Sequence, residues 1–324
     1  MPAKIHFLTF GAGDTWPEAA RRLGDQARST GMFSTVSVET GDEIFSRWPE
    51  FKQHREFVEK NPRGWGYWLW KPFLIRSYFR SLKEDDILLY LDAGFELVNH
   101  GRLPDVFSET AERGSFILSL SEYPILNAIF WTKQDLLDKF SREFSLTDVL
   151  KIPTFAAGCS AYIKNAANTG FLEDWYRIAS SEGYRYIDDT PSLMPQKTHY
   201  FENRHDQSVF NLLLDAYRIE PVGQYLDYNC GAHEFRKWPA LLEQPFLRLG
   251  NRKYETVIPP RRRPSLLDEI KSRLYAKRRR HPMHLRRNHR WVEEMSEPHT
   301  DLLVSLGLLP RRKMDGRIRI PSAR

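Results

Sequence analysis

The stretch Ile87–Glu96, ILLYLDAGFE, decides the fold. Its first five residues form an unbroken apolar run, which is typical of a short strand buried on both faces of a sheet. The run ends at Asp92, and an acid there is costly unless a metal ion or hydrogen-bond donors satisfy it. Ligands of open α/β sheets bind at this end of the strands. The stretch therefore predicts an α/β sheet with a ligand site at Asp92, or else a plain strand-end turn that Asp92 caps.

Length and composition set the frame for this prediction. A chain of 324 residues with 41% hydrophobic content can form one large α/β domain or two smaller ones. We see no signal peptide and no run of about 20 apolar residues that predicts a membrane span. Cys159 and Cys230 lie far apart and have no metal-site spacing. We therefore expect a reduced, cytoplasmic setting.

A second glycine-containing turn lies near the N-terminus. Lys4–Phe10 reads as a strand, Gly11–Gly13 as a turn, and the residues from Trp16 to about Thr30 as a helix. A strand, turn and helix in this order offer free N–H groups to a nucleotide phosphate. The spacing is not that of a dinucleotide-binding fingerprint, and many α/β folds begin in this way.

An aromatic block, GWGYWLWKP, occupies Gly64–Pro72. Its aromatic faces can stack on a base or a sugar, and Lys71 can meet a phosphate as a point charge. The alternative is an aromatic plug of the core before the helix Phe73–Leu82. We favour the ligand wall, because two glycines open a plug rather than fill it.

The later chain supplies the remaining elements of an α/β fold. The helix from Arg204 is amphipathic, and Asp206 in its first turn is either a helix-dipole acid or a group that faces a pocket. Asp188 and Asp189 open a loop and are expected to be solvated. Further strands are predicted at 35–39, 115–120, 155–163 and 218–222, and further helices at 49–60, 103–113, 133–140 and 167–181.

Taken together, these residues resemble the GT-A-fold glycosyltransferases, and more closely the bacterial polysaccharide and lipopolysaccharide sugar transferases. The resemblance rests on the block Gly64–Pro72, the Asp-Ala-Gly strand end at Asp92–Gly94 and the His-Asp-Gln-Ser helix start at His205–Ser208. It covers roughly residues 4–240. It implies a Rossmann-like mixed sheet flanked by helices, in a glycosyltransferase domain of residues 1–260 followed by a basic helical extension of residues 261–324.

The resemblance also implies roles for single residues. Asp206 and Gln207 match an Asp-Gln pair beside the donor sugar in retaining enzymes and are the expected catalytic residues. His233, with Lys237 and Trp238, loosely matches a late metal-binding His and diphosphate-binding Lys. The expected contacts of the nucleotide-sugar donor are Thr9, Phe10, Gly11, Tyr67, Trp70, Lys71, Asp92, Ala93 and Lys237.

The metal site departs from the pattern of the fold. Asp92 matches the first acid of the Asp-x-Asp metal motif, whereas Gly94 stands in place of the second. Either Glu96, a water or His233 completes the shell of Mn²⁺ or Mg²⁺, or the dependence on metal is weaker than in the fold at large. A hard cation there neutralises the diphosphate leaving group, and Lys71 adds positive charge.

The C-terminal residues differ from the body in charge. Residues 261–324 hold 18 Lys and Arg against 7 Asp and Glu, whereas the whole chain holds 48 against 42. The segment 265–295 reads as basic amphipathic helices, which can lie on an anionic membrane surface or pack back on the domain. We expect peripheral attachment to the inner face of the membrane and no nucleic-acid partner, because aromatics are sparse there.

Three functions follow from the sequence. The first is transfer of a sugar, from a UDP-sugar by preference, to a glycan or lipid-linked acceptor in surface polysaccharide synthesis, with retention favoured. The second is a catalytically silent binding protein of the same fold that docks through its basic tail. The third, a nucleotidyltransferase, is expected to carry a cation in its N-terminal loop, and Gly11–Asp14 has none.

Overall fold

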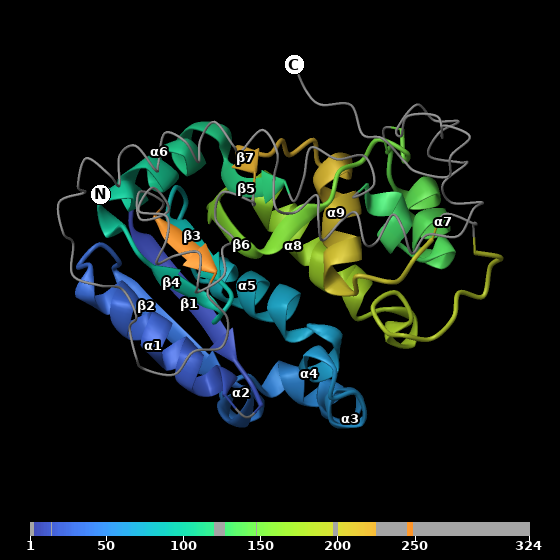
Figure 1. The fold of residues 1–324 in the computed structure, drawn as a ribbon, viewed down its shortest axis with the longest axis horizontal. Helices are drawn as coiled ribbons and strands as arrows, with labels where there is room; N and C mark the ends of the chain where they lie inside the picture. The colour runs from blue at the N-terminus through green and yellow to red at the C-terminus, as the bar shows by residue number, and fades with distance from the viewer. Residues whose placement is uncertain are drawn as a thin grey trace, which may run out of the picture.

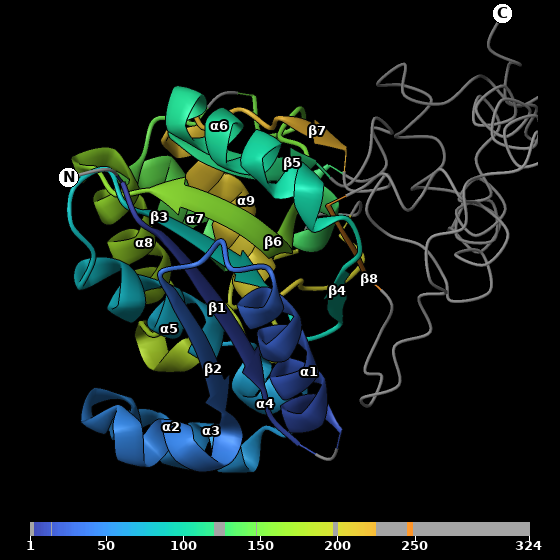
Figure 2. The same ribbon diagram turned by 90° about the vertical axis from the view of Figure 1, so that its left-hand side faces the viewer.

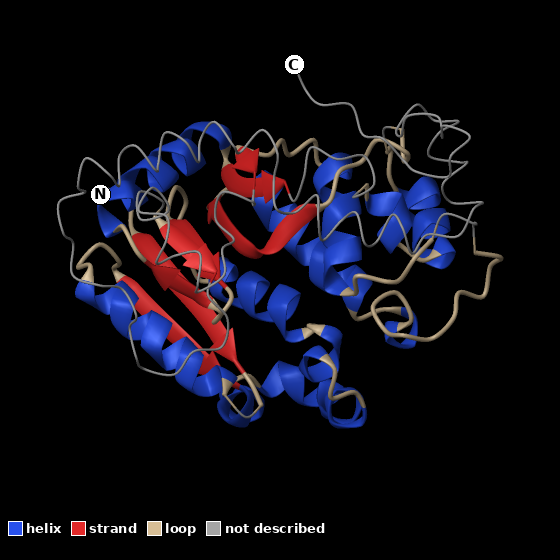
Figure 3. Cartoon of the chain, viewed as in Figure 1, coloured by secondary structure: helices blue, strands red, loops and turns tan. Residues whose placement is uncertain are grey.

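A computed structural model of the chain describes residues 3–13, 15–119, 127–146, 148–196, 200–224 and 245–248. Helices and strands alternate along most of this length (Figures 1 and 3). The elements are β1 (Ile5–Gly11), α1 (Trp16–Ser29), β2 (Thr35–Thr40), α2 (Gly41–Arg47), η1 (Pro49–His54), α3 (Arg55–Lys60), α4 (Gly64–Tyr67), α5 (Trp70–Arg80), β3 (Ile87–Leu91), β4 (Phe95–Leu97), η2 (His100–Arg102), α6 (Leu103–Arg113), β5 (Ser115–Ser119), η4 (Ala128–Trp131), α7 (Gln134–Glu143), β6 (Phe155–Ile163), α8 (Ala166–Ala179), η5 (Glu182–Tyr184), α9 (Asp206–Ala216), β7 (Gly223–Gln224) and β8 (Phe246–Arg248).

The main sheet has the strand order β2-β1-β3-β6-β5-β7. Strand β1 is parallel to β2 and β3, and β5 is parallel to β7, whereas β6 lies antiparallel between β3 and β5. A second sheet pairs β4 with β8. Because Leu8 of β1 pairs with Tyr90 of β3, the carboxyl ends of these two strands lie at the same edge. That edge is where the sequence predicts a ligand.

Helices cover both faces of the main sheet (Figure 2). On one face, α1 and α6 pack against a cluster that includes Phe7, Leu89 and Leu91. On the other face, α5, α8 and α9 pack against a cluster that includes Leu8 and Tyr90. Neighbouring residues of one strand thus belong to opposite clusters, as expected of strands buried on both faces.

Local chemistry explains where several helices begin and end. Proline lies in the first turn of α1 and of α6, where its missing N–H has no helical partner to lose. Helix α6 ends at Gly114, whose φ of 89° is a left-handed cap that other residues rarely adopt. In α8 the Asn165 side chain caps the helix by accepting from the Asn168 N–H at 2.8 Å.

The fold class predicted from the sequence, a mixed α/β sheet flanked by helices, is confirmed. The single helix expected at 49–60 is instead η1 followed by α3, and the strand expected at 218–222 is the two-residue β7 at 223–224. Residues 261–324, which the sequence assigns to a basic helical extension, lie outside the described residues. No helix in the described part of the chain is long and apolar enough to cross a membrane.

Candidate functional site

A cavity of about 360 Å³ opens at the edge of the sheet where β1 and β3 end. Its lining comes from the end of β1 and the turn after it, the turn after β3 and the aromatic block, with Trp16 and Pro62 beside them. Its lining residues are Phe10, Gly11, Ala12, Gly13, Trp16, Pro62, Gly64, Trp65, Trp68, Trp70, Asp92, Ala93 and Gly94. The cavity therefore lies where the sequence predicts a ligand.

The aromatic block forms one wall of this cavity through an unusual backbone path. Five consecutive residues, 64–68, have φ between 50° and 81°, although three of them are aromatic. At Gly64 a Cβ atom would lie 2.4 Å from the Trp68 ring, so the turn needs a glycine there. The Trp70 indole N–H donates to the Gly64 carbonyl at 3.1 Å and closes the turn.

The rings of the aromatic block divide between the cavity and the core. Trp65, Trp68 and Trp70 line the cavity, and Trp70 also stacks on Phe10 with ring centroids 4.0 Å apart. Tyr67 does not line the cavity; it is buried and stacks on His205 with centroids 5.0 Å apart. The block is thus a cavity wall on one side and part of the core on the other, and its role as a ligand wall stays a prediction.

Asp92 is the acidic residue of the cavity lining, and its carboxylate is held from several sides. Lys71 Nζ lies 3.1 Å from Oδ1 and 3.4 Å from Oδ2, and the Tyr90 hydroxyl donates to Oδ1. Behind it, a Cβ atom on Gly158 would lie only 2.4 Å from Oδ2. Gly158 is therefore the residue that leaves room for this carboxylate.

Asp206 lies behind Lys71, away from the cavity lining. Its Oδ2 is 4.0 Å from Lys71 Nζ. This oxygen atom is buried and has no hydrogen-bond partner among the described residues. Burial raises the pKa of Asp206 to about 7, with Lys71 opposing the rise and Asp92 adding to it. We call Lys71, Asp92 and Asp206 the site cluster.

The residues around Asp206 fix its place. His205 precedes it with φ 56°, an uncommon angle for a non-glycine residue, and donates from Nδ1 to the Ile187 carbonyl at 2.7 Å. The Trp175 indole donates to the Asp206 carbonyl at 3.0 Å. Gln207 turns its side-chain amide to the Phe155 carbonyl. In the predicted pair, Asp206 is thus a buried acid, and the Gln207 amide donates a hydrogen bond to the first residue of β6.

The other predicted donor contacts are found in different places. Phe10, Gly11 and Ala93 line the cavity. Thr9 is fully buried and does not line it. His233 and Lys237 lie outside the described residues.

The described residues do not by themselves fit a divalent cation. Both oxygens of Asp92 already lie close to Lys71, and the carboxylate of Glu96 is buried, away from the cavity lining, at 3.8 Å from Arg22. The described part of the chain contains no group of three His, Cys, Asp or Glu side chains that can hold a metal ion. We therefore derive no step of the reaction through a metal.

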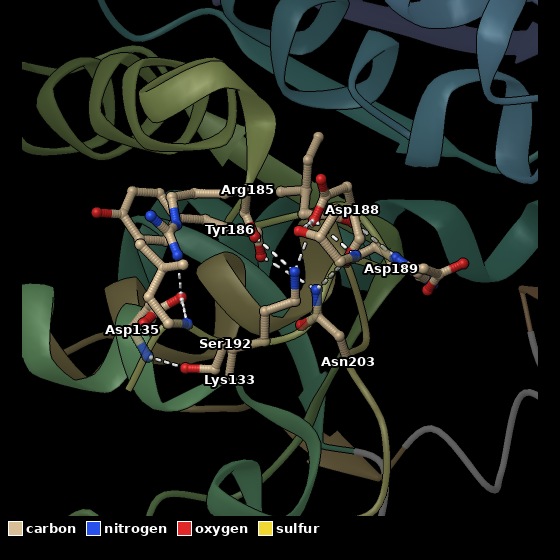
Figure 4. Close-up of polar contacts among 12 residues, drawn as sticks. Lys133, Asp135, Arg185, Tyr186, Asp188, Asp189, Ser192 and Asn203 are labelled. Atoms are coloured by element: carbon tan, nitrogen blue, oxygen red, sulfur yellow. Dashed lines mark hydrogen bonds and ion pairs between the residues drawn. The ribbon is translucent and has the colours of Figure 1, made fainter. Parts of the chain in front are cut away.

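A second cluster of charged side chains joins the start of α7 to the segment between α8 and α9. Lys133 Nζ donates to Asp188 Oδ1 and to the Arg185 carbonyl, both at 2.6 Å. Asp135 accepts from Arg185 at 2.7 Å and from the Leu193 N–H at 3.0 Å. Figure 4 shows these side chains pointing toward one another. We call Lys133, Asp135, Arg185 and Asp188 the loop cluster.

Sequence reasoning missed part of the site. Trp16, Pro62, Trp65 and Trp68 line the cavity, although only Trp65 and Trp68 lie in the block that drew attention. Arg63, beside that block, contacts Asp189 at 3.1 Å and so ties the cavity wall to the loop before α9. The glycines flanking the aromatic rings were the available signal, since they mark a backbone with positive φ.

Among known proteins, this chain has matches in structure alone. No protein-family model and no curated protein matches this chain. The apo form of mouse xyloside xylosyltransferase 1 resembles it with a TM-score of 0.38 and 12% identity, over 76% of this chain and 98% of that one. A glycosyltransferase involved in glycosylation of the major capsid of PBCV-1 resembles it with a TM-score of 0.35 and 12% identity, over 76% and 92%. Likenesses this low say nothing about the residues of the site.

Proposed function

We propose that this chain is a GT-A-type glycosyltransferase that moves a sugar from a nucleotide-sugar to a hydroxyl group. One observation carries the proposal: an aromatic-walled cavity at the carboxyl ends of β1 and β3 is lined by Asp92, and Lys71 and Asp206 lie behind that carboxylate. The aromatic wall suits a planar base, because ring faces stack on one another. The volume of about 360 Å³ falls within the range of small-molecule sites.

The charges of the site cluster suit the transfer step. During transfer the bond between the anomeric carbon and the diphosphate breaks, a bond to the acceptor oxygen forms, and the acceptor hydroxyl loses its proton. The Lys71 ammonium, buried beside Asp92, is a fixed positive charge near the place where the leaving group gains negative charge. Lys71 is therefore proposed to stabilise the departing diphosphate.

Asp206, 4.0 Å from Lys71, is the second acid proposed to take part in the transfer. A pKa of about 7 lets its carboxyl exist in both protonation states near neutral pH. In a retaining enzyme it flanks the sugar and the departing diphosphate takes the acceptor proton, whereas in an inverting enzyme Asp206 takes that proton. We favour retention, with a UDP-sugar as donor and a glycan or lipid-linked acceptor, on the Asp-Gln resemblance at Asp206–Gln207.

The nucleotide-sugar is tested by nucleotide release from a panel of UDP-, GDP-, CMP- and dTDP-sugars. We expect release from one class, strongly reduced in Asp92→Asn and unchanged in Asp105→Asn, whose side chain is exposed on α6. Equal release by both variants would contradict the proposed site. NMR of the product distinguishes retention from inversion.

The divalent cation is proposed on the resemblance alone, with Asp92 and His233 as ligands of Mn²⁺ or Mg²⁺ and Glu96 as the further candidate. Removing metal with EDTA is expected to lower the rate of release, and added Mn²⁺ to restore it. A rate that EDTA leaves unchanged would remove the cation from the proposal and leave the donor site intact.

Attachment to an anionic membrane through residues 265–295, at the inner face of a cytoplasmic membrane, also stays a proposal. It rests on the charge and periodicity of that segment in the sequence. Flotation of the full chain with vesicles is expected when they contain phosphatidylserine and not when they contain phosphatidylcholine alone. Equal flotation with both would contradict it.

A catalytically silent binding protein is the second candidate, favoured by Gly94 in place of the second acid of the metal motif. Such a protein would be stabilised by a nucleotide-sugar and would release no nucleotide from it. The release assay, read beside the stabilisation by the same donor, separates the two functions.

A further inference from the structure

The turn that carries Asp92 rests on a buried arginine of α1. Arg22 Nη2 donates to the Ala93 carbonyl at 3.0 Å and to the Phe95 carbonyl at 2.9 Å. Only 3% of Arg22 is exposed, and it does not line the cavity. Arg22 therefore holds the turn from the side opposite the cavity.

Glu96 accompanies Arg22 as its counter-ion. Its Oε1 lies 3.8 Å from Arg22 Nη1, and the residue is fully buried. A charge this deep is retained only where it is paired, because removing one partner leaves the other unsatisfied. The pair thus fixes a guanidinium under the turn, and Glu96 has a role that needs no metal.

The position of Arg22 determines where the next amide points. A trans peptide unit directs its C=O and its N–H in opposite directions, and the structure has no cis peptide bond in the described residues. Since the Ala93 carbonyl points at Arg22, the Gly94 N–H points away from it. Gly94 lines the cavity, and its N–H makes no hydrogen bond with the described residues. This N–H is therefore available to a ligand.

We propose that the Gly94 N–H donates a hydrogen bond to a diphosphate oxygen of the donor, and that Arg22 and Glu96 are positioning residues for it. This inference rests on the proposed function. A backbone N–H favours an anionic oxygen, and glycine lets that oxygen approach closely. A carboxylate at the same position would repel the diphosphate unless a cation lay between them. In this proposal the Gly94 N–H binds the diphosphate directly, at the position where the Asp-x-Asp motif carries its second acid.

The hydrogen bond itself is tested by NMR on the full chain labelled with ¹⁵N-glycine. The chain has 18 glycines, and the signal that Gly94→Ala removes is that of Gly94. The probes are UDP, GDP, CDP and dTDP, each compared with its nucleoside. We expect the Gly94 amide proton to move downfield with one diphosphate and to stay in place with the matching nucleoside.

The positioning role is tested by calorimetry on Arg22 variants. Arg22→Met combined with Glu96→Gln removes both buried charges, so that neither is left unpaired. Loss of one hydrogen bond to a charged group corresponds to about a tenfold loss of diphosphate affinity. The affinity for the matching nucleoside is expected to stay the same. An unfolded variant would bind neither ligand, so this measurement is the control for folding. Arg22→Lys keeps the charge but not the contact with two carbonyls. Its diphosphate affinity is expected to lie between that of the wild type and that of the double variant.

A matched control is Arg76→Met. Arg76 pairs with Glu173 at the same 3.8 Å but lies on α5, outside the cavity lining. It is expected to lower stability and leave both affinities unchanged.

The outcomes separate this inference from the proposed function. A diphosphate that binds while the Gly94 signal stays in place, or that binds the Arg22 variant as tightly as the wild type, would overturn the inference alone. Failure of all four diphosphates to bind the wild-type chain would overturn the proposed function and the inference with it.

Discussion

The site cluster and the loop cluster each hold a lysine and two aspartates, yet they differ in how well the aspartates are satisfied. In the loop cluster Lys133 has two oxygen partners at 2.6 Å. In the site cluster Lys71 lies 3.1 Å from Asp92 and 4.0 Å from Asp206. In the loop cluster both aspartates accept hydrogen bonds from cationic side chains (Figure 4), whereas in the site cluster Asp206 Oδ2 lacks a hydrogen-bond partner among the described residues.

The pKa values follow the same division. Burial alone would raise the pKa of Asp135, but hydrogen bonds from the Leu193 N–H and the Ser192 side chain help to lower it overall. In Asp206 burial prevails and raises the pKa to about 7. Aspartates that accept hydrogen bonds from cationic side chains stabilise a loop, and an unsatisfied buried acid next to a cavity-lining carboxylate is a candidate for chemistry.

The largest expected effect is on the reaction. Asp206→Asn keeps the shape of the side chain and removes its acid, so we expect the rate of sugar transfer to fall by about 10²–10⁴-fold. Asp188→Asn in the loop cluster is expected to lower stability and to leave the rate per folded molecule unchanged. Steady-state kinetics on folded protein decides, and equal losses would remove the distinction between the clusters.

The next effect is on stability. Lys133→Met leaves Asp188 buried without its ammonium partner, which costs about 3–5 kcal/mol in comparable pairs. Urea unfolding measures this loss. Calorimetry with the donor should show unchanged affinity in the variant under conditions where it stays folded. A loss below about 1 kcal/mol would mean that the loop cluster is not the stabilising one.

The pH dependence of stability is expected to differ between the wild type and Asp206→Asn. The folded pKa of Asp206 is raised to about 7, above its unfolded value of 3.8. Between these values the folded state binds more protons than the unfolded chain, so stability falls as pH rises. The penalty, up to about 4 kcal/mol, is complete above the folded pKa and absent below the unfolded one. Urea unfolding at about pH 5 and about pH 8 should show Asp206→Asn gaining on the wild type at the higher pH; parallel curves would contradict the buried acid.

The smallest expected effect comes from one methyl group. Gly158→Ala places a Cβ about where Asp92 Oδ2 now approaches, at 2.4 Å, so the carboxylate has to shift. A displacement of this size can lower the rate by up to about 10²-fold. We expect little change in the unfolding midpoint, because the end of a side chain moves rather than the backbone. An unchanged rate would show that the position of Asp92 is not critical.

The sequence predicted the parts of the site that depend on local pattern. The strand that ends at Asp92, the aromatic block and the helix start at Asp206 each have a signature within ten residues, and each lies where that signature places it. Contacts between distant segments were not predictable. Asp188 was expected to be solvated and instead contacts Lys133. The contact of Glu96, a candidate metal ligand, with Arg22 at 3.8 Å was not anticipated either.

The same limit applies within the aromatic block. Tyr67 was expected to touch the donor, but the left-handed backbone at residues 64–68 turns it toward His205 and leaves Trp65 and Trp68 on the cavity side. In a regular strand or helix the side-chain period predicts which face of the element a residue lies on. This turn follows neither period. The single glycines at Gly64 and Gly66 indicated the turn without revealing its direction.

The measurement that tests the central claim most directly is a thermal-shift screen of the full chain with UDP-, GDP-, CMP- and dTDP-sugars, each with and without manganese. A donor at one hundred times its dissociation constant stabilises the folded state by about 2.7 kcal/mol. We predict stabilisation by one nucleotide class that Asp92→Ala abolishes and Lys133→Met does not. No stabilisation by any donor, or stabilisation that Asp92→Ala leaves intact, would contradict the claim that this cavity is a nucleotide-sugar site.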